Sequence, residues 1–326
     1  MKKVSFIEGV SPRGHININR FYITELGDSI STIYVGNSLS YSYKDIDKVE
    51  FFDDNNLLRS RLFRAMGFVW NTWKLIYKVK SNKINTVCLL SYDPLLLFLV
   101  VYFSRLMGIR LYTFEHNTVP VSGWHKYFLQ YICFRWVKRI CYTPKAVKMY
   151  KNMGQKAIYI PHPIIYKEPE VSDKLIKDFS CYRKKYKIIV FCPSASASID
   201  TLLLKAKEHS NILFIIKTKQ IIKLNNVIAM PYFEDYATLS NLVDFFYLPV
   251  SLSESRVSGP FFEAIGVGKK IILQKGSFYD YAKQYFENYI YLDKESWEFD
   301  KDIKEVINIK NYNNKIISKL KDFIDA

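Results

Sequence analysis

A short stretch at residues 253–264 carries the residue types that bind a phosphorylated ligand: a basic side chain, small residues and a carboxylate. Arg256 can donate a fork of hydrogen bonds to a phosphate. Ser258 and Gly259 allow a ligand to approach the backbone N–H groups where a helix is expected to begin. Glu263 is expected in the first turn of that helix, where its carboxylate can accept hydrogen bonds from both ribose hydroxyls. The spacing predicts an anion site beside a ribose site, with a helix cap and a solvated glutamate as the structural alternative.

A second polar group, Glu115-His116-Asn117, directly follows a predicted buried strand at 109–114. A histidine at a strand end is placed to act as a general base or to contact a sugar. Glu115 is the alternative base, because it is one of only two acidic residues between positions 55 and 165. A structural histidine in the core is the competing interpretation.

A third group follows two predicted strands of the second half of the chain. Ser194 and Ser196 can donate hydrogen bonds to phosphate, and Lys217, at the end of the next strand, can supply a cation. With residues 256–259, these side chains predict donors to the phosphate groups of a ligand.

The elements that must position these residues alternate between strand and helix. In the first half, strands are expected at 4–8, 32–35, 86–90, 109–114, 140–143 and 157–160, and helices at 57–80, from Asp93-Pro94 to Gly108, from about Trp124, and from Pro144. A Pro-flanked segment at 161–169 is predicted to be a linker. After it the alternation of strand and helix begins again, with strands expected at 187–191, 212–216, 226–230, 244–250 and 270–274. This pattern predicts α/β architecture with two doubly wound domains, residues 1–165 and 166–326, and a last helix that packs back on either domain.

The stretch from Ser253 to Ile272 resembles the donor-nucleotide motif of GT-B glycosyltransferases, especially the family-4-like enzymes of bacterial O-antigen and exopolysaccharide synthesis. The resemblance implies two Rossmann-like domains facing across a cleft, with a nucleotide-sugar bound to the second. Glu263 matches the second glutamate of the family's paired motif. Ser255 stands where the first glutamate is expected, and Glu254 is displaced from it by one position. The stereochemical outcome of transfer is therefore open.

The same resemblance implies roles for residues of the first domain. Enzymes of this kind often carry a His-Asn pair at the strand end occupied here by His116 and Asn117, facing the acceptor or the donor sugar. Arg13 and His15 lie in the first loop, a common acceptor-contact position. His162, between two prolines, is similar to the family's interdomain hinge and is read as structural.

The charge of the chain is concentrated in its first half. The whole chain has 47 basic and 31 acidic residues, and residues 1–165 contain 23 of the basic and 10 of the acidic ones, a net charge of +13. Basic helices that also carry aromatic side chains suit an anionic membrane surface. A plain solvated surface and nucleic acid are the alternatives, but no nucleic-acid motif is recognised and no nucleic-acid partner is expected.

Other features limit the classes of protein that the sequence can encode. The longest apolar run has nine residues, from Leu95 to Phe103, whereas a membrane-spanning helix needs about 20. Five cysteines without a CxxC pair indicate core thiols in a reducing compartment. The N-terminus does not resemble a signal peptide. We therefore expect a cytoplasmic protein, peripheral on the inner face of the cell membrane.

Together these features predict a metal-independent glycosyltransferase (hexosyltransferase) without a cofactor. It would move a sugar from a UDP- or GDP-linked nucleotide-sugar to a lipid-linked oligosaccharide acceptor, in the synthesis of lipopolysaccharide or another bacterial surface polysaccharide. The alternatives are a nucleotide-sugar epimerase of the same fold, and a non-catalytic basic protein that binds membranes or nucleic acid.

Overall fold

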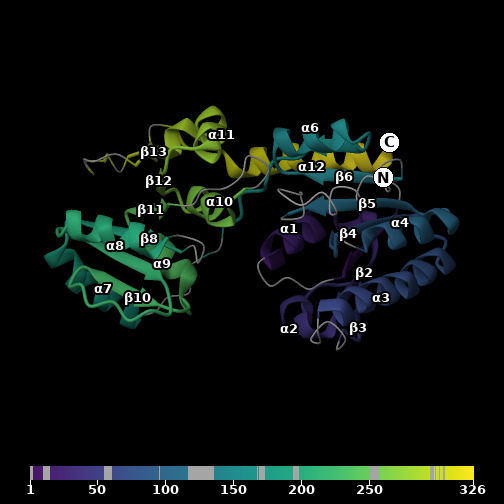
Figure 1. The fold of residues 1–326 in the computed structure, drawn as a ribbon, viewed down its shortest axis with the longest axis horizontal. Coiled ribbons are helices and arrows are strands. Elements are labelled where there is room, and N and C mark those ends of the chain that lie inside the picture. The colour runs from purple at the N-terminus through teal and green to yellow at the C-terminus, as the bar shows by residue number, and fades with distance from the viewer. Residues whose placement is uncertain are drawn as a thin grey trace. The chain divides into compact units, whose positions relative to one another are not determined.

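The computed structural model divides the chain into two compact units, Met1–Pro163 with Asn313–Ala326, and Ile164–Tyr312 (Figure 1). The boundary expected from the sequence lies after residue 165. The structure describes residues 3–9, 15–54, 61–94, 96–116, 136–166, 168, 173–193, 198–249, 257–293, 297, 299–300, 302–303 and 305–326. The helix expected from about Trp124 lies outside these residues.

The first unit is built on a parallel seven-stranded sheet with the order β3-β2-β1-β4-β5-β6-β7. Its strands are β1 (Val4–Glu8), β2 (Ile30–Gly36), β3 (Val49–Phe52), β4 (Thr86–Ser91), β5 (Arg110–Glu115), β6 (Val137–Cys141) and β7 (Lys156–Tyr159), and its helices are α1 (Ile16–Leu26), α2 (Ser40–Tyr43), α3 (Arg61–Ser81), α4 (Leu97–Leu106) and α6 (Pro144–Asn152). The last helix of the chain, α12 (Ile309–Asp325), contributes residues 313–325 to this unit. The central strands are continuous apolar runs because both faces of the sheet are covered.

Helices cover both faces of this sheet. α3 and α4 pack on one face, where Ile76 and Val100 join the core made by Val87 and Leu111 of the strands. α1 and α12 cover the other face, as shown by ring contacts of Tyr22 with Phe114 at 4.9 Å and of Tyr112 with Phe323 at 5.6 Å between centroids. α6 begins where a sequence signal places it, because Thr143 accepts a hydrogen bond from the Ala146 amide at 3.1 Å and proline follows the cap.

The second unit has a parallel six-stranded sheet with the order β10-β9-β8-β11-β12-β13. Its strands are β8 (Ile188–Cys192), β9 (Ile212–Lys217), β10 (Val227–Met230), β11 (Phe245–Leu248), β12 (Lys270–Leu273) and β13 (Ile290–Leu292), and its helices are α7 (Asp173–Lys185), α8 (Ile199–Glu208), α9 (Tyr236–Leu242), α10 (Gly259–Gly266) and α11 (Ser277–Phe286). The helices α7, α9, α10 and α11 contribute to one core, and α8 packs with Trp297 on another.

Both sheets have the strand order of a doubly wound fold, in which the chain reverses direction across the sheet beside its first strand. The reversal lies between β1 and β4 in the first unit and between β8 and β11 in the second. Ligands of such sheets bind outside the carboxyl ends of the strands at this point. The fold class predicted from the sequence, α/β with two Rossmann-like units, is confirmed.

Candidate functional site

The first unit brings three histidines together at the carboxyl edge of its sheet. The ring of His15, at the start of α1, stacks on His116, directly after β5, with centroids 4.0 Å apart and an interplanar angle of 24°. Tyr142, after β6, lies against His116 at 5.2 Å and against His162 at 5.5 Å. His15 and His116, which were predicted separately, thus lie in one cluster, and it includes His162, which was read as structural.

Burial keeps these imidazoles neutral. It lowers the pKa of His116 well below its usual value, and the neighbouring His15 and His162 lower it further. Burial lowers the pKa of His15 to about 4. It also lowers the pKa of His162 to about 4, although Nδ1 of His162 donates a hydrogen bond to the Pro163 carbonyl at 2.8 Å. A neutral imidazole has a nitrogen that can accept a proton, which a general base requires.

His116 has a nitrogen available for a ligand. Its side chain is buried, and within the described part of the chain its Nε2 makes no hydrogen bond. Buried polar atoms are nearly always paired, so an unpaired one needs an explanation, and a bound ligand is one such explanation. His116 follows β5 at the carboxyl edge of the sheet, one strand away from the reversal between β1 and β4.

Glu115 lies on the opposite side of β5 from His116, because successive side chains of a strand alternate. Its carboxylate is fully buried and forms an ion pair with Arg139 at 3.0 Å. The hydroxyls of Tyr92, Tyr150 and Thr113 donate hydrogen bonds to the two carboxylate oxygens at 2.5, 2.6 and 2.6 Å. A catalytic role for Glu115 stays a prediction that this geometry does not favour, because protein donors already occupy both oxygens.

In the second unit, Glu263 lies on α10 with an unanticipated partner. The hydroxyl of Tyr236, the first residue of α9, donates a hydrogen bond to Oε2 of Glu263 at 2.7 Å. Burial raises the pKa of Tyr236 well above its usual value, and the charge of Glu263 raises it further. The hydroxyl therefore stays protonated and holds the carboxylate in one orientation.

The start of α10 differs from the expectation in one respect. Glu263 was expected in the first turn, but the helix begins at Gly259 and its first turn contains no acidic residue. Glu263 is the fifth residue of α10 and lies one turn further along. Ser258 occupies the N-cap position without a side-chain capping bond to any described residue. The first backbone N–H groups of a helix have no partner within the helix, so this helix start is a candidate anion site.

The remaining predicted residues divide between those that the structure describes and those that it does not. Lys217 is the last residue of β9, half-buried at the carboxyl edge of the second sheet. The predicted residues that lie outside the described ranges are Arg13, Asn117, Ser194, Ser196 and Arg256. In the sequence, residues 194–196 closely follow β8 and Arg256 follows β11, the two strands that flank the reversal of the second sheet.

Tyr142, Tyr236 and the part played by His162 were not predicted from the sequence. Tyr142 lies inside the strand expected at 140–143, and tyrosines are common in this chain, which has 25, so nothing marks it as a site residue. Tyr236 gives no local signal because its partner lies 27 positions away. Among the described residues no group of three His, Cys, Asp or Glu side chains is arranged to hold a metal ion.

Comparison with solved structures places this chain among GT-B folds. It is similar to HepE of Anabaena in complex with UDP, with a TM-score of 0.63, 14% identity, and coverage of 98% of this chain and 91% of HepE. It is also similar to the lipopolysaccharide outer core galactosyltransferase WaaB, with a TM-score of 0.58, 12% identity, and coverage of 98% and 100%. A UDP-N-acetylglucosamine 2-epimerase from Rickettsia bellii matches with a TM-score of 0.54, 13% identity, and coverage of 100% and 97%.

These likenesses show that the chain has the GT-B fold, as the motif at residues 253–272 implied. No family model and no curated protein sequence matches the chain. The membership of a particular glycosyltransferase family therefore stays a prediction.

Proposed function

We propose that this protein is a glycosyltransferase that takes a sugar from a nucleoside diphosphate-sugar and joins it to an acceptor hydroxyl. The observation that carries the proposal is the buried, unpaired Nε2 of neutral His116, stacked on His15 at the carboxyl edge of the first sheet. Glu263, oriented by Tyr236 beside the start of α10, supplies the complementary site for a nucleotide in the second unit.

In the proposed reaction His116 removes the proton from the acceptor hydroxyl. The acceptor oxygen forms a bond to the anomeric carbon, the bond from that carbon to the diphosphate oxygen breaks, and the nucleoside diphosphate leaves with the electron pair. Lys217, Arg256 and the N–H groups at the start of α10 stabilise the negative charge of the leaving group. Ser194 and Ser196 are proposed as further donors to the phosphates, and Glu263 as the ribose ligand.

The donor is proposed to be a UDP- or GDP-linked sugar. HepE, whose fold this chain shares, was solved in complex with UDP, which favours UDP. The test is calorimetric binding of UDP, GDP, CDP and dTDP to the wild type and to Glu263→Ala. We expect one diphosphate to bind, and the substitution to weaken it by about 1.5–3 kcal/mol, the contribution of a charged hydrogen-bond partner. No binding of any nucleotide by the folded protein would exclude the proposal.

The roles of the two units are separable by mutation. His116→Gln is expected to abolish sugar transfer while nucleotide binding persists, whereas Glu263→Ala weakens nucleotide binding. Equal loss of nucleotide binding in both variants would contradict the assignment of His116 to catalysis. Metal independence is checked in the same assay, because activity is expected to survive excess EDTA.

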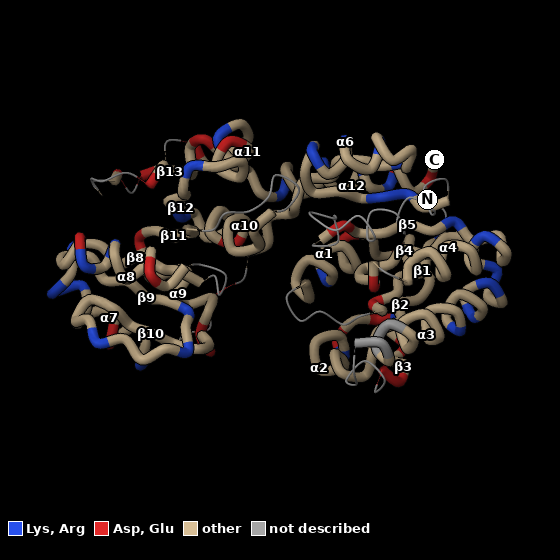
Figure 2. The backbone as a smooth tube through the Cα atoms, viewed as in Figure 1, with Lys and Arg blue, Asp and Glu red and all other residues tan. Residues whose placement is uncertain are grey.

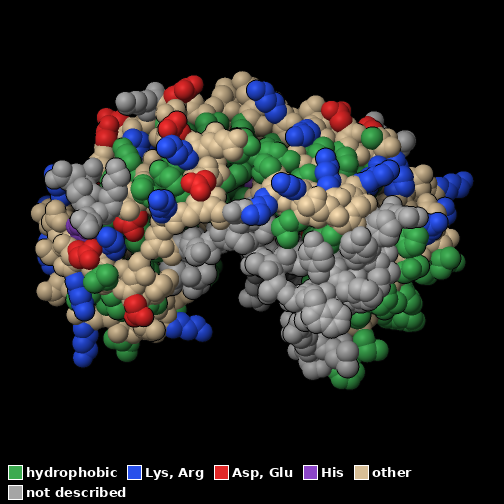
Figure 3. Space-filling view, turned by 45° about the horizontal axis from the view of Figure 1, so that its top comes forward, with side chains coloured by type: hydrophobic (Ala, Val, Ile, Leu, Met, Phe, Trp, Pro, Cys, Tyr) green, Lys and Arg blue, Asp and Glu red, His purple; other side chains and the backbone are tan. Residues whose placement is uncertain are grey.

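The acceptor is proposed to be a lipid-linked oligosaccharide presented at an anionic membrane on the cytoplasmic side, as in the synthesis of surface polysaccharides. Support comes from α3, whose side chains Phe63, Met66, Trp70 and Tyr77 are each more than half exposed. These positions follow the i, i+3, i+7, i+14 spacing of one helix face. Figure 2 shows Lys and Arg along α3 and α4, and Figure 3 shows hydrophobic side chains beside basic ones on the visible face of this unit.

Arg13, His15 and Asn117 are proposed as acceptor contacts. Among the described helices none is long and apolar enough to cross a bilayer.

A nucleotide-sugar epimerase is the second candidate, favoured by the similarity to the Rickettsia enzyme. An epimerase needs no acceptor, so it would convert UDP-N-acetylglucosamine to its 2-epimer in the absence of lipid. A glycosyltransferase would release UDP only when an acceptor is present. Nuclear magnetic resonance of the sugar after incubation without acceptor distinguishes the two.

A further inference from the structure

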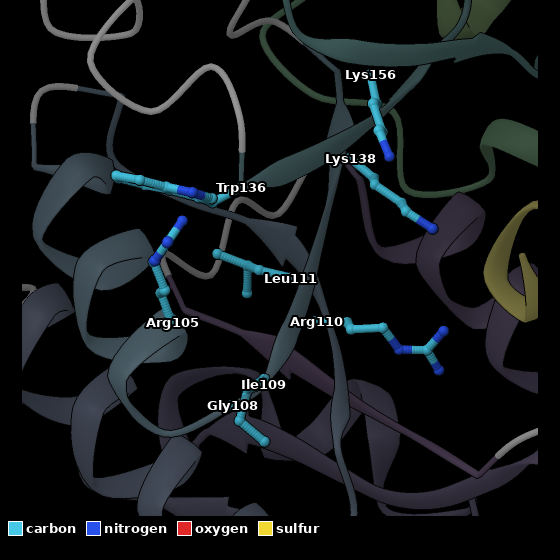
Figure 4. A pocket seen from close by; sticks show the side chains of 8 residues that line it. All are labelled: Arg105, Gly108, Ile109, Arg110, Leu111, Trp136, Lys138 and Lys156. Atoms are coloured by element: carbon cyan, nitrogen blue, oxygen red, sulfur yellow. The ribbon is translucent and has the colours of Figure 1, made fainter.

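A basic pocket lies at the amino edge of the first sheet, at the opposite ends of the strands from the histidine cluster. Figure 4 shows the side chains that line it, from the end of α4 and the starts of β5, β6 and β7. Its volume is about 260 Å³, and it is lined by Arg105, Gly108, Ile109, Arg110, Leu111, Trp136, Lys138 and Lys156. The lining contains four cations and no acidic residue.

The sheet register places three of these cations on one face. Lys138 of β6 and Lys156 of β7 are direct neighbours in the parallel pairing. Tyr112 of β5 is the partner of Lys138, and Arg110 lies two residues before it on the same face. Neighbouring parallel strands are about 4.8 Å apart, so these like charges repel one another unless an anion lies between them.

The protein compensates this charge only in part. Burial raises the pKa of Tyr112, and the nearby negative charge of Asp325 on α12 raises it further. The Tyr112 hydroxyl in turn accepts a hydrogen bond from Lys138 at 2.9 Å. Across the described ranges no ion pair joins a carboxylate to Arg105, Arg110 or Lys156. Arg110 instead donates a hydrogen bond to the Thr86 hydroxyl at 2.8 Å.

Arg105 is held in place by an aromatic ring. Its guanidinium lies 4.2 Å from the centre of the Trp136 ring, and Tyr102 packs edge-on against the same ring at 5.1 Å. An arginine fixed in this way loses little further freedom when it binds a ligand. Beside it, Leu106 at the end of α4 is 83% exposed, so an exposed apolar side chain stands next to the pocket.

We propose that this pocket binds a phosphate-bearing group with two or more negative charges, at a site separate from the proposed donor and acceptor sites. Arg110, Lys138 and Lys156 supply charge from one face of the sheet, and Arg105 supplies it from the end of α4 beside Trp136. The same phosphate chemistry is offered by a soluble phosphorylated compound and by the headgroup of an anionic phospholipid.

The test uses inorganic pyrophosphate as the probe and the indole N–H resonance of Trp136 as the reporter, assigned with Trp136→Phe. The pocket variant is Arg105→Gln/Lys156→Gln. Its control is Lys148→Gln/Lys151→Gln on α6, two exposed lysines whose removal lowers the net charge equally. Both pairs are exposed, and unchanged unfolding temperatures show that the variants are folded.

We expect pyrophosphate to shift the Trp136 resonance of the wild type and of the control with similar affinity. The pocket variant is expected to bind at least about tenfold more weakly, because charged hydrogen bonds to phosphate are lost. A Trp136 resonance that does not move at millimolar pyrophosphate, or equal affinity of the pocket and control variants, would overturn the proposal.

A second experiment, binding to lipid vesicles, then identifies the source of the phosphate group. Sedimentation is measured with vesicles of phosphatidylglycerol and phosphatidylcholine, and with phosphatidylcholine alone. Loss of binding to the anionic vesicles in the pocket variant, but not in the control, assigns the site to a lipid headgroup. Unchanged vesicle binding together with weakened pyrophosphate binding assigns it to a soluble phosphorylated ligand.

Discussion

Tyr236 and Glu263 show how one hydroxyl can prepare a carboxylate for a ligand. The tyrosine donates a hydrogen bond to Oε2 of the carboxylate at 2.7 Å, which fixes the orientation in which Glu263 is proposed to meet a ribose. Tyr236→Phe is therefore expected to weaken binding of the preferred nucleoside diphosphate by about 0.5–1.5 kcal/mol, less than Glu263→Ala does. Calorimetry on Tyr236→Phe, with Tyr232→Phe as an exposed control, checks this. An unchanged affinity would remove Tyr236 from the site.

The neutral histidines make the stability of the protein depend on pH. The pKa values of His15 and His162 are about 4 in the folded chain, against an ordinary value of 6.5. Below pH 6.5 the unfolded chain therefore binds protons that the folded chain does not, and the free energy of unfolding falls as the pH decreases from 6.5 to about 4. Above pH 6.5 this contribution is fully present.

Urea unfolding at a series of pH values measures this dependence. His162→Asn is expected to lose less stability than the wild type between pH 6.5 and 4, with parallel curves above pH 7.5, where both carry neutral side chains. If the two proteins lose stability equally over the acidic range, His162 does not titrate as its burial implies.

At the scale of elements, α3 presents an apolar face to solvent that packing does not explain. Trp70 and Tyr77 are 56% and 64% exposed, and Lys74 lies 5.0 Å above the Trp70 ring. Trp70→Ser/Tyr77→Ser is expected to reduce sedimentation with anionic vesicles several-fold, because interfacial aromatic side chains anchor a basic helix at headgroup depth. The matched control is Ile221→Ser/Tyr232→Ser, which removes exposed apolar side chains from the second unit. Equal effects of the two pairs would contradict a membrane role for α3.

The sequence predicts the alternating α/β pattern because buried parallel strands are continuous apolar runs, as in β4 and β8. It does not reveal β13, a strand of three residues. It also misses α11, whose aromatic residues at 277–286 favour strands by propensity. The secondary structure of such segments is determined by their packing on the sheet, which brings together residues that are distant in the sequence.

The same distinction applies to the candidate site. The positions of His116 and Glu263 after predicted strands follow from the parallel topology alone. The stacking of His15 on His116 across about a hundred residues of sequence, and the hydrogen bond from Tyr236, depend on tertiary structure. The partners of Glu115 likewise come from three other segments, so the sequence could not distinguish a buried ion pair from a base.

At the scale of the whole molecule, the first unit is completed by the last helix of the chain. Ile316, Ile317, Leu320 and Ile324 of α12 are buried, and the Tyr112 hydroxyl donates a hydrogen bond to the Ile324 carbonyl at 3.1 Å. Each buried aliphatic side chain contributes about 1.5–3 kcal/mol, and a domain has only about 5–15 kcal/mol in total.

A fragment of residues 1–163 is therefore expected to be unstable. Joining residues 309–326 to it through a flexible linker is expected to restore a cooperative thermal transition in circular dichroism. The control carries Leu320→Asp in the added helix and should fail to restore the transition. A stable fragment without α12 would show that the helix is dispensable for this unit.

Because α12 belongs to the first unit, it also sets the order in which the two units can fold during synthesis. The second unit is continuous in the sequence, from Ile164 to Tyr312, whereas the first needs residues from 313 onward. During synthesis the nascent chain can therefore finish the unit that carries Glu263 before the unit that carries His116, although the latter is translated first. Until α12 has been synthesised the first unit is incomplete. Its sheet, with its basic and aromatic surfaces, stays uncovered near the ribosome, and chaperones can bind it during that interval.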